Sequence, residues 1–128
     1  MQPQSNQNQN TRPNYWGRYE SNHSVSLGAL HISPASNLVQ VGDIAVFLRP
    51  MEFRLLHFFM THPNKVHTRE QLLEQVWGDW IVVGERTVDV HIRRLRATLQ
   101  PFGLGSVIKT VHCRGYLFIN ESSAASIN

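Results

Sequence analysis

Short apolar runs alternate with polar segments in the part of the chain that begins at residue 25. The runs VSLGALHI (25–32), LVQV (38–41) and IAVFL (44–48) are separated by the segments SPASN and GD. Pro, Asn, Asp and Gly are common turn residues because each favours a backbone conformation that turns need. The pattern therefore predicts a small antiparallel meander.

Longer apolar patterns at helical spacing follow the meander. Proline suits the first position of a helix, and the segment MEFRLLHFFM after it predicts a mostly buried helix over residues 50–62. Arg49 is then the N-cap, although it has no oxygen to accept the first N–H groups. Thr68 and Gln71 have the spacing of a capping box, which predicts a second helix that ends at Gly78.

Residues 86–99 predict a third helix with a narrow apolar stripe and basic residues on its other faces. At 100° per residue, its core stripe falls within about 60° and consists of Val88, Ile92, Leu95 and Leu99. The other faces carry Arg86, Thr87, Asp89, Val90, His91, Arg93, Arg94 and Arg96. We expect Asp89 to orient a neighbouring arginine through a local ion pair.

The last pattern is a hairpin. The runs VIKTV (107–111) and YLFI (116–119) flank HCRG, in which Gly115 can adopt a positive φ. Together these elements predict an α+β fold: a winged helix-turn-helix with an N-terminal antiparallel sheet, three helices and a C-terminal β-hairpin wing.

The two ends of the chain lack such patterns. Residues 1–24 are polar and begin MQPQSNQNQN, so they bury too little apolar surface to offset the entropy of ordering them. We expect a flexible Asn/Gln-rich arm or linker there, a winged-helix domain over 25–120 and a disordered tail over 121–128. Domains commonly have about this size.

Composition excludes several classes of protein. A single cysteine among 128 residues rules out an internal disulfide framework and a cysteine-based zinc cluster. No apolar run approaches a membrane span, and the N-terminus lacks a signal-peptide core, so the expectation is a cytoplasmic protein without a membrane partner. We expect no catalytic residue, metal or cofactor.

Charge is distributed unevenly. The formal net charge is +3, but residues 86–114 alone carry five arginines and one lysine against a single aspartate. A concentrated basic segment on a nearly neutral body is typical of a nucleic-acid surface, although a solvated basic helix would give the same count.

The arrangement of the basic segment favours DNA. The major groove of B-DNA admits one helix, whose polar side chains can bond base edges while Arg or Lys contacts phosphates. One sector of the third helix suits base edges and contains Thr87, Val90, His91 and Arg94. Arg86 and Arg93 flank this sector and Arg96 lies towards the opposite edge, and all three positions suit phosphates. The hairpin tip would bring His112 and Arg114 to a neighbouring groove.

Two tracts, HFFMTHPNKVHTREQLLEQVWG and RTVDVHIRRLR, resemble the effector domains of the OmpR/PhoB-type winged-helix response regulators. The resemblance extends over about residues 27–119. It implies a four-stranded N-terminal sheet, base contacts from Val90 and Arg94, and backbone contacts from or beside Arg86, His91, Arg93 and Arg96. It further implies phosphate contacts from Arg69, Trp77 and Thr110. At the wing tip, His112-Cys113-Arg114 replaces the family's usual Arg-Gly-x.

The resemblance also implies partners. Members bind promoter DNA with direct repeats as tandem dimers, so we expect a monomer when the chain is free. The loop between the second and third helices contacts RNA polymerase, in some members through the sigma subunit. Here that loop comprises Asp79, Trp80, Ile81, Val82, Val83, Gly84 and Glu85. The phosphoacceptor receiver domain is expected to be absent from residues 1–24, since a receiver requires a domain of its own.

Other interpretations remain open on the sequence alone. A thiol enzyme would use Cys113 beside His112, but no third group is placed to orient them. A metal site could use His57, His62 and His67, yet burial or solvation is the more common state of such residues. A winged-helix module that binds only proteins is the main alternative, since a fold does not fix a function.

Overall fold

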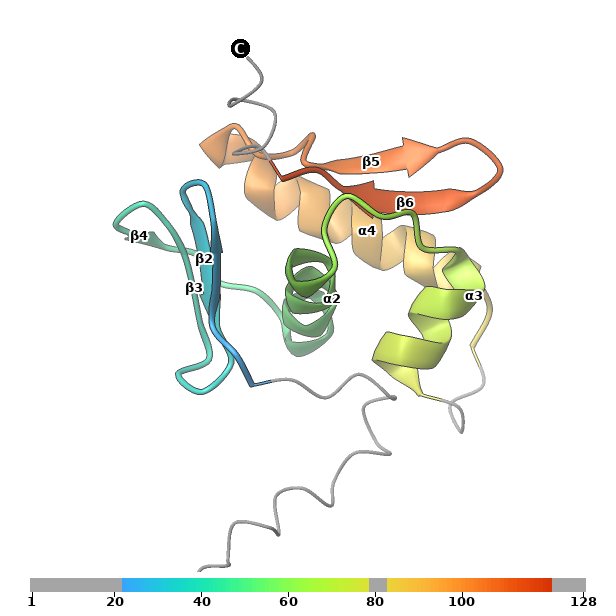
Figure 1. Ribbon diagram of the computed structural model, residues 1–128, viewed down its shortest axis with the longest axis horizontal. Coiled ribbons are helices and arrows are strands. Elements are labelled where there is room, and N and C mark those ends of the chain that lie inside the picture. The colour runs from blue at the N-terminus through green and yellow to red at the C-terminus, as the bar shows by residue number, and fades with distance from the viewer. Residues whose placement is uncertain (1–21, 79–82, 121–128) are drawn as a thin grey trace, which may run out of the picture.

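The computed structural model describes residues 22–78 and 83–120, and in this part of the chain a four-stranded sheet, three helices and a two-stranded hairpin follow one another (Figure 1). The sheet lies at one end of the molecule and the tip of the hairpin at the other. The predicted winged-helix architecture is confirmed. The predicted arm and tail fall almost entirely on residues outside the described ranges.

The N-terminal sheet is an antiparallel meander of β1 (Val25–Leu27), β2 (Leu30–Ser33), β3 (Leu38–Val41) and β4 (Ile44–Ala45). The run 25–32 was expected as one segment, but it forms two strands joined by a turn at Gly28, whose φ is 63°. Glycine adopts this left-handed conformation without a Cβ clash, so a single residue splits the run. The four strands agree with the family resemblance.

The third apolar run, residues 44–48, forms a shorter strand than the sequence predicted. Only Ile44–Ala45 pairs with β3, and the segment then leaves the sheet before the first helix. Phe47 is 82% exposed as a result.

Helix α2 (Pro50–Thr61) begins at the predicted proline and packs against the sheet and against α4. Arg49 is the N-cap as predicted, and its side chain makes no capping hydrogen bond. Glu52, at the third helical position, is 3% exposed, and its Oε2 has no hydrogen-bond partner among the described residues. In a capping box, a Thr or Ser N-cap would pair reciprocally with this glutamate.

We therefore expect Arg49→Thr to raise the free energy of unfolding by about 0.5–2 kcal/mol. The introduced threonine hydroxyl would accept the N–H of Glu52, and the Glu52 carboxylate would accept the backbone N–H of the N-cap residue. Thermal denaturation measures the effect as an increase of several degrees in Tm. Arg49→Ala is the matched control, because it removes the same side chain and supplies no oxygen. Equal Tm values for the two variants would contradict the capping argument.

Helix α3 (Arg69–Leu72) starts with the predicted capping box. The Gln71 N–H donates to Thr68 Oγ1 at 3.0 Å, and the Thr68 N–H donates to Gln71 Oε1 at 2.8 Å. The helix continues as a π-helical turn, η3 (Leu73–Trp77), and ends at Gly78 as predicted.

Helix α4 (Arg86–Leu99) has the predicted bounds and the predicted core stripe. Each of Val88, Ile92, Leu95 and Leu99 is at most 1% exposed. A short 3₁₀ turn, η4 (Gln100–Phe102), follows and ends at Gly103, whose φ is 76°. This helix lies beneath the hairpin along its length (Figure 1).

The hairpin consists of β5 (Ile108–Val111) and β6 (Gly115–Phe118). Gly115 has the expected positive φ, 147°, but the tip itself is formed by Cys113, which has a φ of 64°. Gly115 meets a second requirement, because a Cβ there would lie 2.0 Å from the His67 carbonyl oxygen. This close approach lets His67 and Tyr116 exchange two backbone hydrogen bonds, at 2.8 and 2.9 Å. The wing is thereby joined to the segment just before α3.

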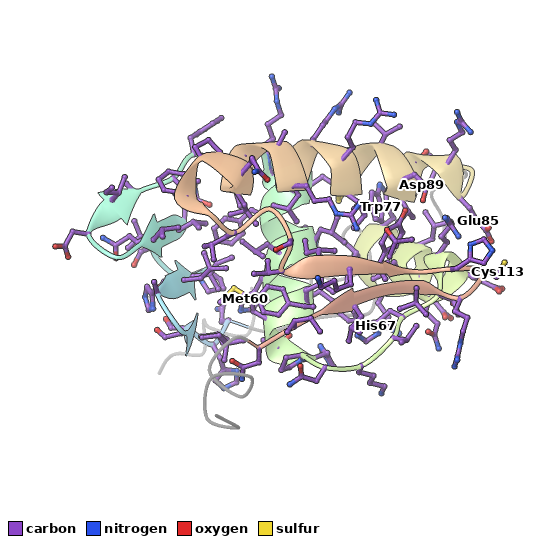
Figure 2. The ribbon with its side chains drawn as sticks, turned by 90° about the horizontal axis from the view of Figure 1, so that it is seen from above. Met60, His67, Trp77, Glu85, Asp89 and Cys113 are labelled. Carbon is purple, nitrogen blue, oxygen red and sulfur yellow. The ribbon has the colours of Figure 1, made fainter. Side chains whose placement is uncertain are left out.

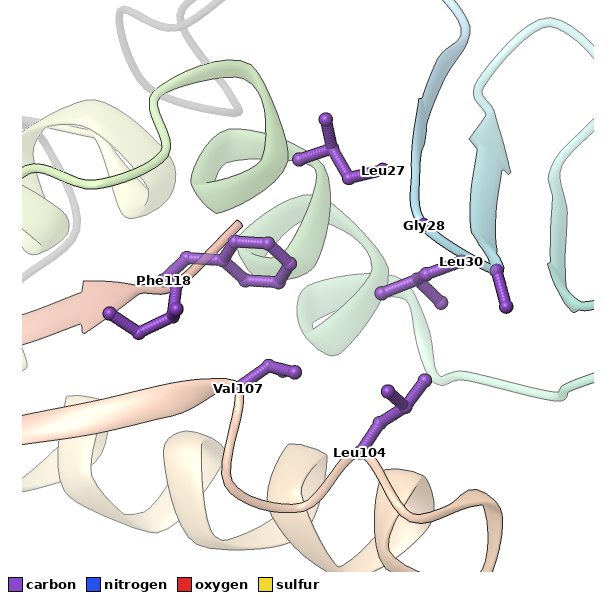
Figure 3. A pocket seen from close by; sticks show the side chains of 8 residues that line it. Leu27, Gly28, Leu30, Leu104, Val107 and Phe118 are labelled. Atoms are coloured by element: carbon purple, nitrogen blue, oxygen red, sulfur yellow. The ribbon is translucent and has the colours of Figure 1, made fainter. Parts of the chain in front are cut away.

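A small apolar cleft lies where the sheet meets the base of the hairpin (Figure 3). Its lining residues are Leu27, Gly28, Ala29, Leu30, Leu104, Val107, Phe118 and Ile119. None of these side chains is titratable, so the cleft supplies no acid, base or nucleophile. No helix in the described part of the chain is long and apolar enough to cross a membrane.

His57, His62 and His67 pack within α2 and the connection after it. His57 and His67 are buried, with exposed fractions of 2% and 5%. Nε2 of His57 lies 2.7 Å from the His23 carbonyl, and Nε2 of His67 lies 3.3 Å from the His62 carbonyl. The His67 ring also packs edge-on against Phe58 at 4.9 Å. Of the two states that the sequence left open, burial or solvation, His57 and His67 adopt burial. No group of three potential metal ligands occurs within residues 22–78 and 83–120.

Burial lowers the pKa of both His57 and His67 below the ordinary histidine value. The unfolded chain therefore binds protons near pH 6.5, whereas the folded chain binds them only at lower pH. The stability contributed by the neutral rings is fully present above about pH 6.5 and is lost as the pH falls towards the folded-state pKa.

We accordingly expect Tm to decrease between pH 7 and pH 5, and His67→Gln to flatten this decrease. The glutamine amide keeps a donor for the His62 carbonyl but does not titrate. Thermal denaturation across this pH range measures the slope, and His112→Gln, at an exposed position, is the control. A slope in His67→Gln as steep as in the wild type would contradict the assignment to His67.

Candidate nucleic-acid interface

The outer face of α4 presents an exposed set of basic and small side chains. Arg86, Val90, Arg93 and Arg94 are exposed, and Thr87 is partly buried at the edge of this set. Figure 2 shows long nitrogen-tipped side chains that project from the outer face of this helix. Five of the residues expected to contact DNA thus share the solvent-facing side opposite the core stripe: Arg86, Thr87, Val90, Arg93 and Arg94.

His91 and Trp77 connect this face to the end of the second helix. His91 is partly buried, with Nδ1 2.9 Å from the Thr87 carbonyl and its ring edge-on to Trp77 at a centroid distance of 5.3 Å. Trp77 is 4% exposed, so its ring is mainly a core group. A phosphate contact from its indole N–H stays a prediction.

Asp89 lies on the side of α4 that faces the hairpin (Figure 2). Its Oδ1 accepts a hydrogen bond from Arg69 Nε at 2.7 Å and another from the Tyr116 hydroxyl at 2.5 Å. The expected ion pair exists, but its arginine comes from α3, twenty positions earlier in the chain. Such a pair depends on tertiary structure, and spacing along one helix could not identify it.

The protonation of this cluster reflects its hydrogen bonds. Burial alone would raise the pKa of Asp89, but the Tyr116 hydroxyl and the Arg69 guanidinium hold it below its usual value. Burial and the bond to Asp89 raise the pKa of Tyr116, and the bond to Asp89 also raises the pKa of Arg69. Asp89 is therefore a carboxylate and Tyr116 a neutral donor at neutral pH.

Arg96 reaches the hairpin from the same edge of α4. Its Nε and Nη2 donate to the Ile108 carbonyl at 3.1 and 2.8 Å, and Nη2 also donates to Thr110 Oγ1 at 2.8 Å. The guanidinium lies 5.6 Å from the centre of the Tyr116 ring. Arg96 and Thr110, both expected to contact phosphates, are thus bonded to each other, a contact that the sequence did not indicate.

The wing tip is exposed to solvent. His112, Cys113 and Arg114 are all exposed, and the turn is closed by the Arg114 N–H, which donates to the Val111 carbonyl at 2.9 Å. Figure 2 places Cys113 at the same end of the molecule as Glu85, which immediately precedes α4. The wing tip and the start of α4 therefore lie at one end of the structure.

Lys109 is an exposed cation on β5 that was not among the expected contact residues. Its alternation with the buried Ile108 is the signal that could have identified it, because successive strand residues face opposite sides.

Most of the loop expected to contact RNA polymerase is outside the described residues, since Asp79, Trp80, Ile81 and Val82 fall there. The remaining residues of the loop, Val83, Gly84 and Glu85, are exposed. The exposed fraction of Val83 is 36%.

A helix with an exposed basic face, preceded by a second helix and followed by an exposed basic hairpin, defines a winged helix-turn-helix of the DNA-binding type. Residues 43–118 match the family described as "Transcriptional regulatory protein, C terminal". The chain belongs to this family of regulator effector domains.

The relatives support the same assignment. The chain is 49% identical over 94 residues to the phosphate regulon transcriptional regulatory protein PhoB of Escherichia coli, covering 73% of this chain and 41% of that protein. It therefore spans about two fifths of that relative's length. The DNA-binding domain of RstA from Klebsiella pneumoniae, solved in complex with the RstA box, is 35% identical with a TM-score of 0.63. That likeness covers 76% of this chain and 97% of the RstA chain. The DNA-binding domain of AdeR, solved with an intercistronic region, is 28% identical with a TM-score of 0.65, over 72% and 95% of the two chains.

Proposed function

We propose that this chain is a sequence-specific, double-stranded DNA-binding effector domain of a two-component transcription regulator. In this proposal α4 reads the major groove and the hairpin of β5 and β6 enters the adjacent minor groove. The observation that carries it is the exposed basic face of α4, with the basic wing tip at the same end of the molecule as the start of that helix. The DNA complexes of RstA and AdeR, which share the fold, support it.

The exposed positions of α4 suggest separate roles. Arg94 and Val90 would contact base edges, as the family resemblance implies, because both are exposed and lie in the sector of α4 that also contains Thr87. Arg86 and Arg93 lie beside them and would contact phosphates, which supply affinity without sequence information. His91 would lie beside the DNA backbone. Arg69, Trp77, Arg96 and Thr110 would contact phosphates nearer the wing, and His112 and Arg114 would enter the minor groove.

Assembly, partners and location are further parts of the proposal. The domain, residues 25–120, would occupy promoter direct repeats as a tandem dimer and remain a monomer when free. Residues 79–85 would contact RNA polymerase through its sigma subunit. The protein would act in the cytoplasm and would catalyse no reaction.

Retention on duplex DNA distinguishes this proposal from a module that binds only proteins. The chain should bind a mixed pool of promoter fragments, and its affinity should decrease steeply between 50 and 200 mM salt, because phosphate contacts release counterions. A chain that fails to bind duplex DNA even at low salt would support the protein-binding alternative.

The native cysteine offers a direct test of the wing. Cys113 is the chain's single cysteine and lies at the exposed wing tip. If the wing enters the minor groove, bound duplex DNA should slow its alkylation at least several-fold, measured by mass spectrometry over time. The control is Cys113→Ser combined with Ser36→Cys, which moves the thiol to the exposed turn after β2, in the sheet at the other end of the molecule. Equal protection of both thiols, or of neither, would contradict a specific contact by the wing.

A further inference from the structure

One carboxylate oxygen joins three elements of the fold. Oδ1 of Asp89 on α4 accepts from Arg69 of α3 and from Tyr116 of β6. The Arg69 guanidinium also lies 5.4 Å from the centre of the Tyr116 ring. The second helix, the third helix and the wing therefore meet at a single point.

A second attachment lies further along α4. Arg96 is seven positions after Asp89, which is about 10.5 Å along a helix. It donates three hydrogen bonds to the opposite strand of the hairpin, two to the Ile108 carbonyl and one to Thr110 Oγ1. Its guanidinium also lies over the ring of Tyr116, the residue bonded to Asp89. Two positions of α4 about two turns apart thus hold one cross-strand pair of the hairpin, Thr110 and Tyr116, and together they restrict its angle to the helix more than either contact alone.

These contacts are poorly suited to a purely stabilising role. The side chains of Arg69 and Asp89 are 33% and 37% exposed, and ion pairs with this much exposure contribute little to folding free energy. The hairpin is already anchored by the buried Ile108 and Phe118 and by the backbone bonds between His67 and Tyr116. The apolar core already attaches the hairpin, and the polar contacts fix its orientation relative to α4.

We propose that Arg69, Asp89, Tyr116 and Arg96 form a positioning network that fixes the wing relative to α4. The proposal rests on the proposed function, in which α4 and the wing occupy adjacent grooves of one duplex. Both contacts form together only if the distance and angle between them match the DNA, and such sites lose affinity when their supporting contacts loosen. The four residues are positioning residues in this role, because they act through the wing tip.

Tyr116→Phe isolates this role, because it removes one hydroxyl and keeps the ring. We expect it to weaken binding to a specific duplex about threefold or more. An effect of this size is typical of residues that interact within one network. In a chain whose tip is neutralised by His112→Ala and Arg114→Ala, the same substitution should have no effect on affinity. In an Arg94→Ala chain it should keep its full effect, because Arg94 contacts DNA from α4. A loss confined to chains with an intact tip is a result that a merely structural role would not produce.

Arg96→Gln tests the other attachment point and replaces Tyr116→Phe should that variant fold poorly. Its loss of affinity should be larger with an intact tip than in the neutralised chain, because only the phosphate contact of Arg96 itself can be lost there. An equal loss of affinity with and without the wing tip would overturn the positioning role, as would no loss in either chain. A tip whose neutralisation leaves affinity unchanged would overturn it too. Failure of the wild-type chain to bind duplex DNA would instead overturn the proposed function, so the two failures are distinguishable.

Discussion

Arg94→Ala is expected to weaken binding to a specific site far more than binding to a scrambled duplex. Arg94 is exposed on the outer face of α4, where its planar guanidinium can bond a guanine edge with two hydrogen bonds. Each such pair contributes about 1–3 kcal/mol of discrimination against the wrong base. Equilibrium titrations against both duplexes measure the two losses, and their ratio reports specificity.

Arg93→Ala is the matched control, since Arg93 is the adjacent exposed arginine of the same helix. A phosphate contact should be lost equally from both duplexes, and the slope of log affinity against log salt should decrease in magnitude by about one unit. Arg96 is a poorer control than its charge suggests, because its guanidinium also holds the hairpin. Equal specificity ratios for the Arg93 and Arg94 variants would refute the assignment of Arg94 to a base.

The second large effect concerns DNA spacing. A single domain of this size makes few phosphate contacts and should bind weakly, in the range of about 10⁻⁴–10⁻⁶ M for non-specific binding. Two domains on direct repeats one helical turn apart lie on the same face of the duplex and can contact each other. Occupancy of the two repeats should therefore be cooperative.

Insertion of half a helical turn between the repeats rotates the second domain to the opposite face, so cooperativity should disappear. Binding isotherms on the two duplexes measure this change, and a duplex with one scrambled repeat gives the affinity of a single domain. Sedimentation of the chain alone should show a monomer. Cooperativity that survives the half-turn insertion would mean that the domains do not assemble in tandem.

Local patterns predicted the helices well because their determinants lie within a few residues. The periodicity of Val88, Ile92, Leu95 and Leu99 specified the bounds and the buried face of α4. The capping box of Thr68 and Gln71 likewise specified the start of α3. Each signal involves neighbours on a single helix, so it needs no knowledge of the tertiary structure.

The turns were predicted less well, because one residue can have either a local or a distant role. The run 25–32 contains a single Gly28 and resembled one strand, although that glycine makes a turn. At the wing, Gly115 was the apparent turn residue. Cys113 forms the tip instead, and Gly115 serves the close approach to His67. The position of a residue 48 places away along the chain cannot be inferred from a short local pattern.

The candidate site also contains features that local patterns predicted and others that they could not. The exposed face of α4 and the wing tip follow from periodicity and hairpin pattern, and both are where the sequence placed them. The pairing of Asp89 with Arg69 and of Arg96 with Thr110 required the packing of α3, α4 and the hairpin. Charge patterns therefore located the surface, and only the structure revealed which arginines also hold the wing.

Selection of bound duplexes from a random pool, with the wild-type chain and Arg94→Ala in parallel, tests the central claim most directly. The account predicts that the wild type enriches a short motif that occurs twice in the same orientation about one helical turn apart. It predicts that Arg94→Ala loses the preference at one base pair of each repeat and keeps the rest. Enrichment of no motif by the wild type, or of an identical motif by both chains, would contradict the claim that α4 reads DNA sequence through Arg94.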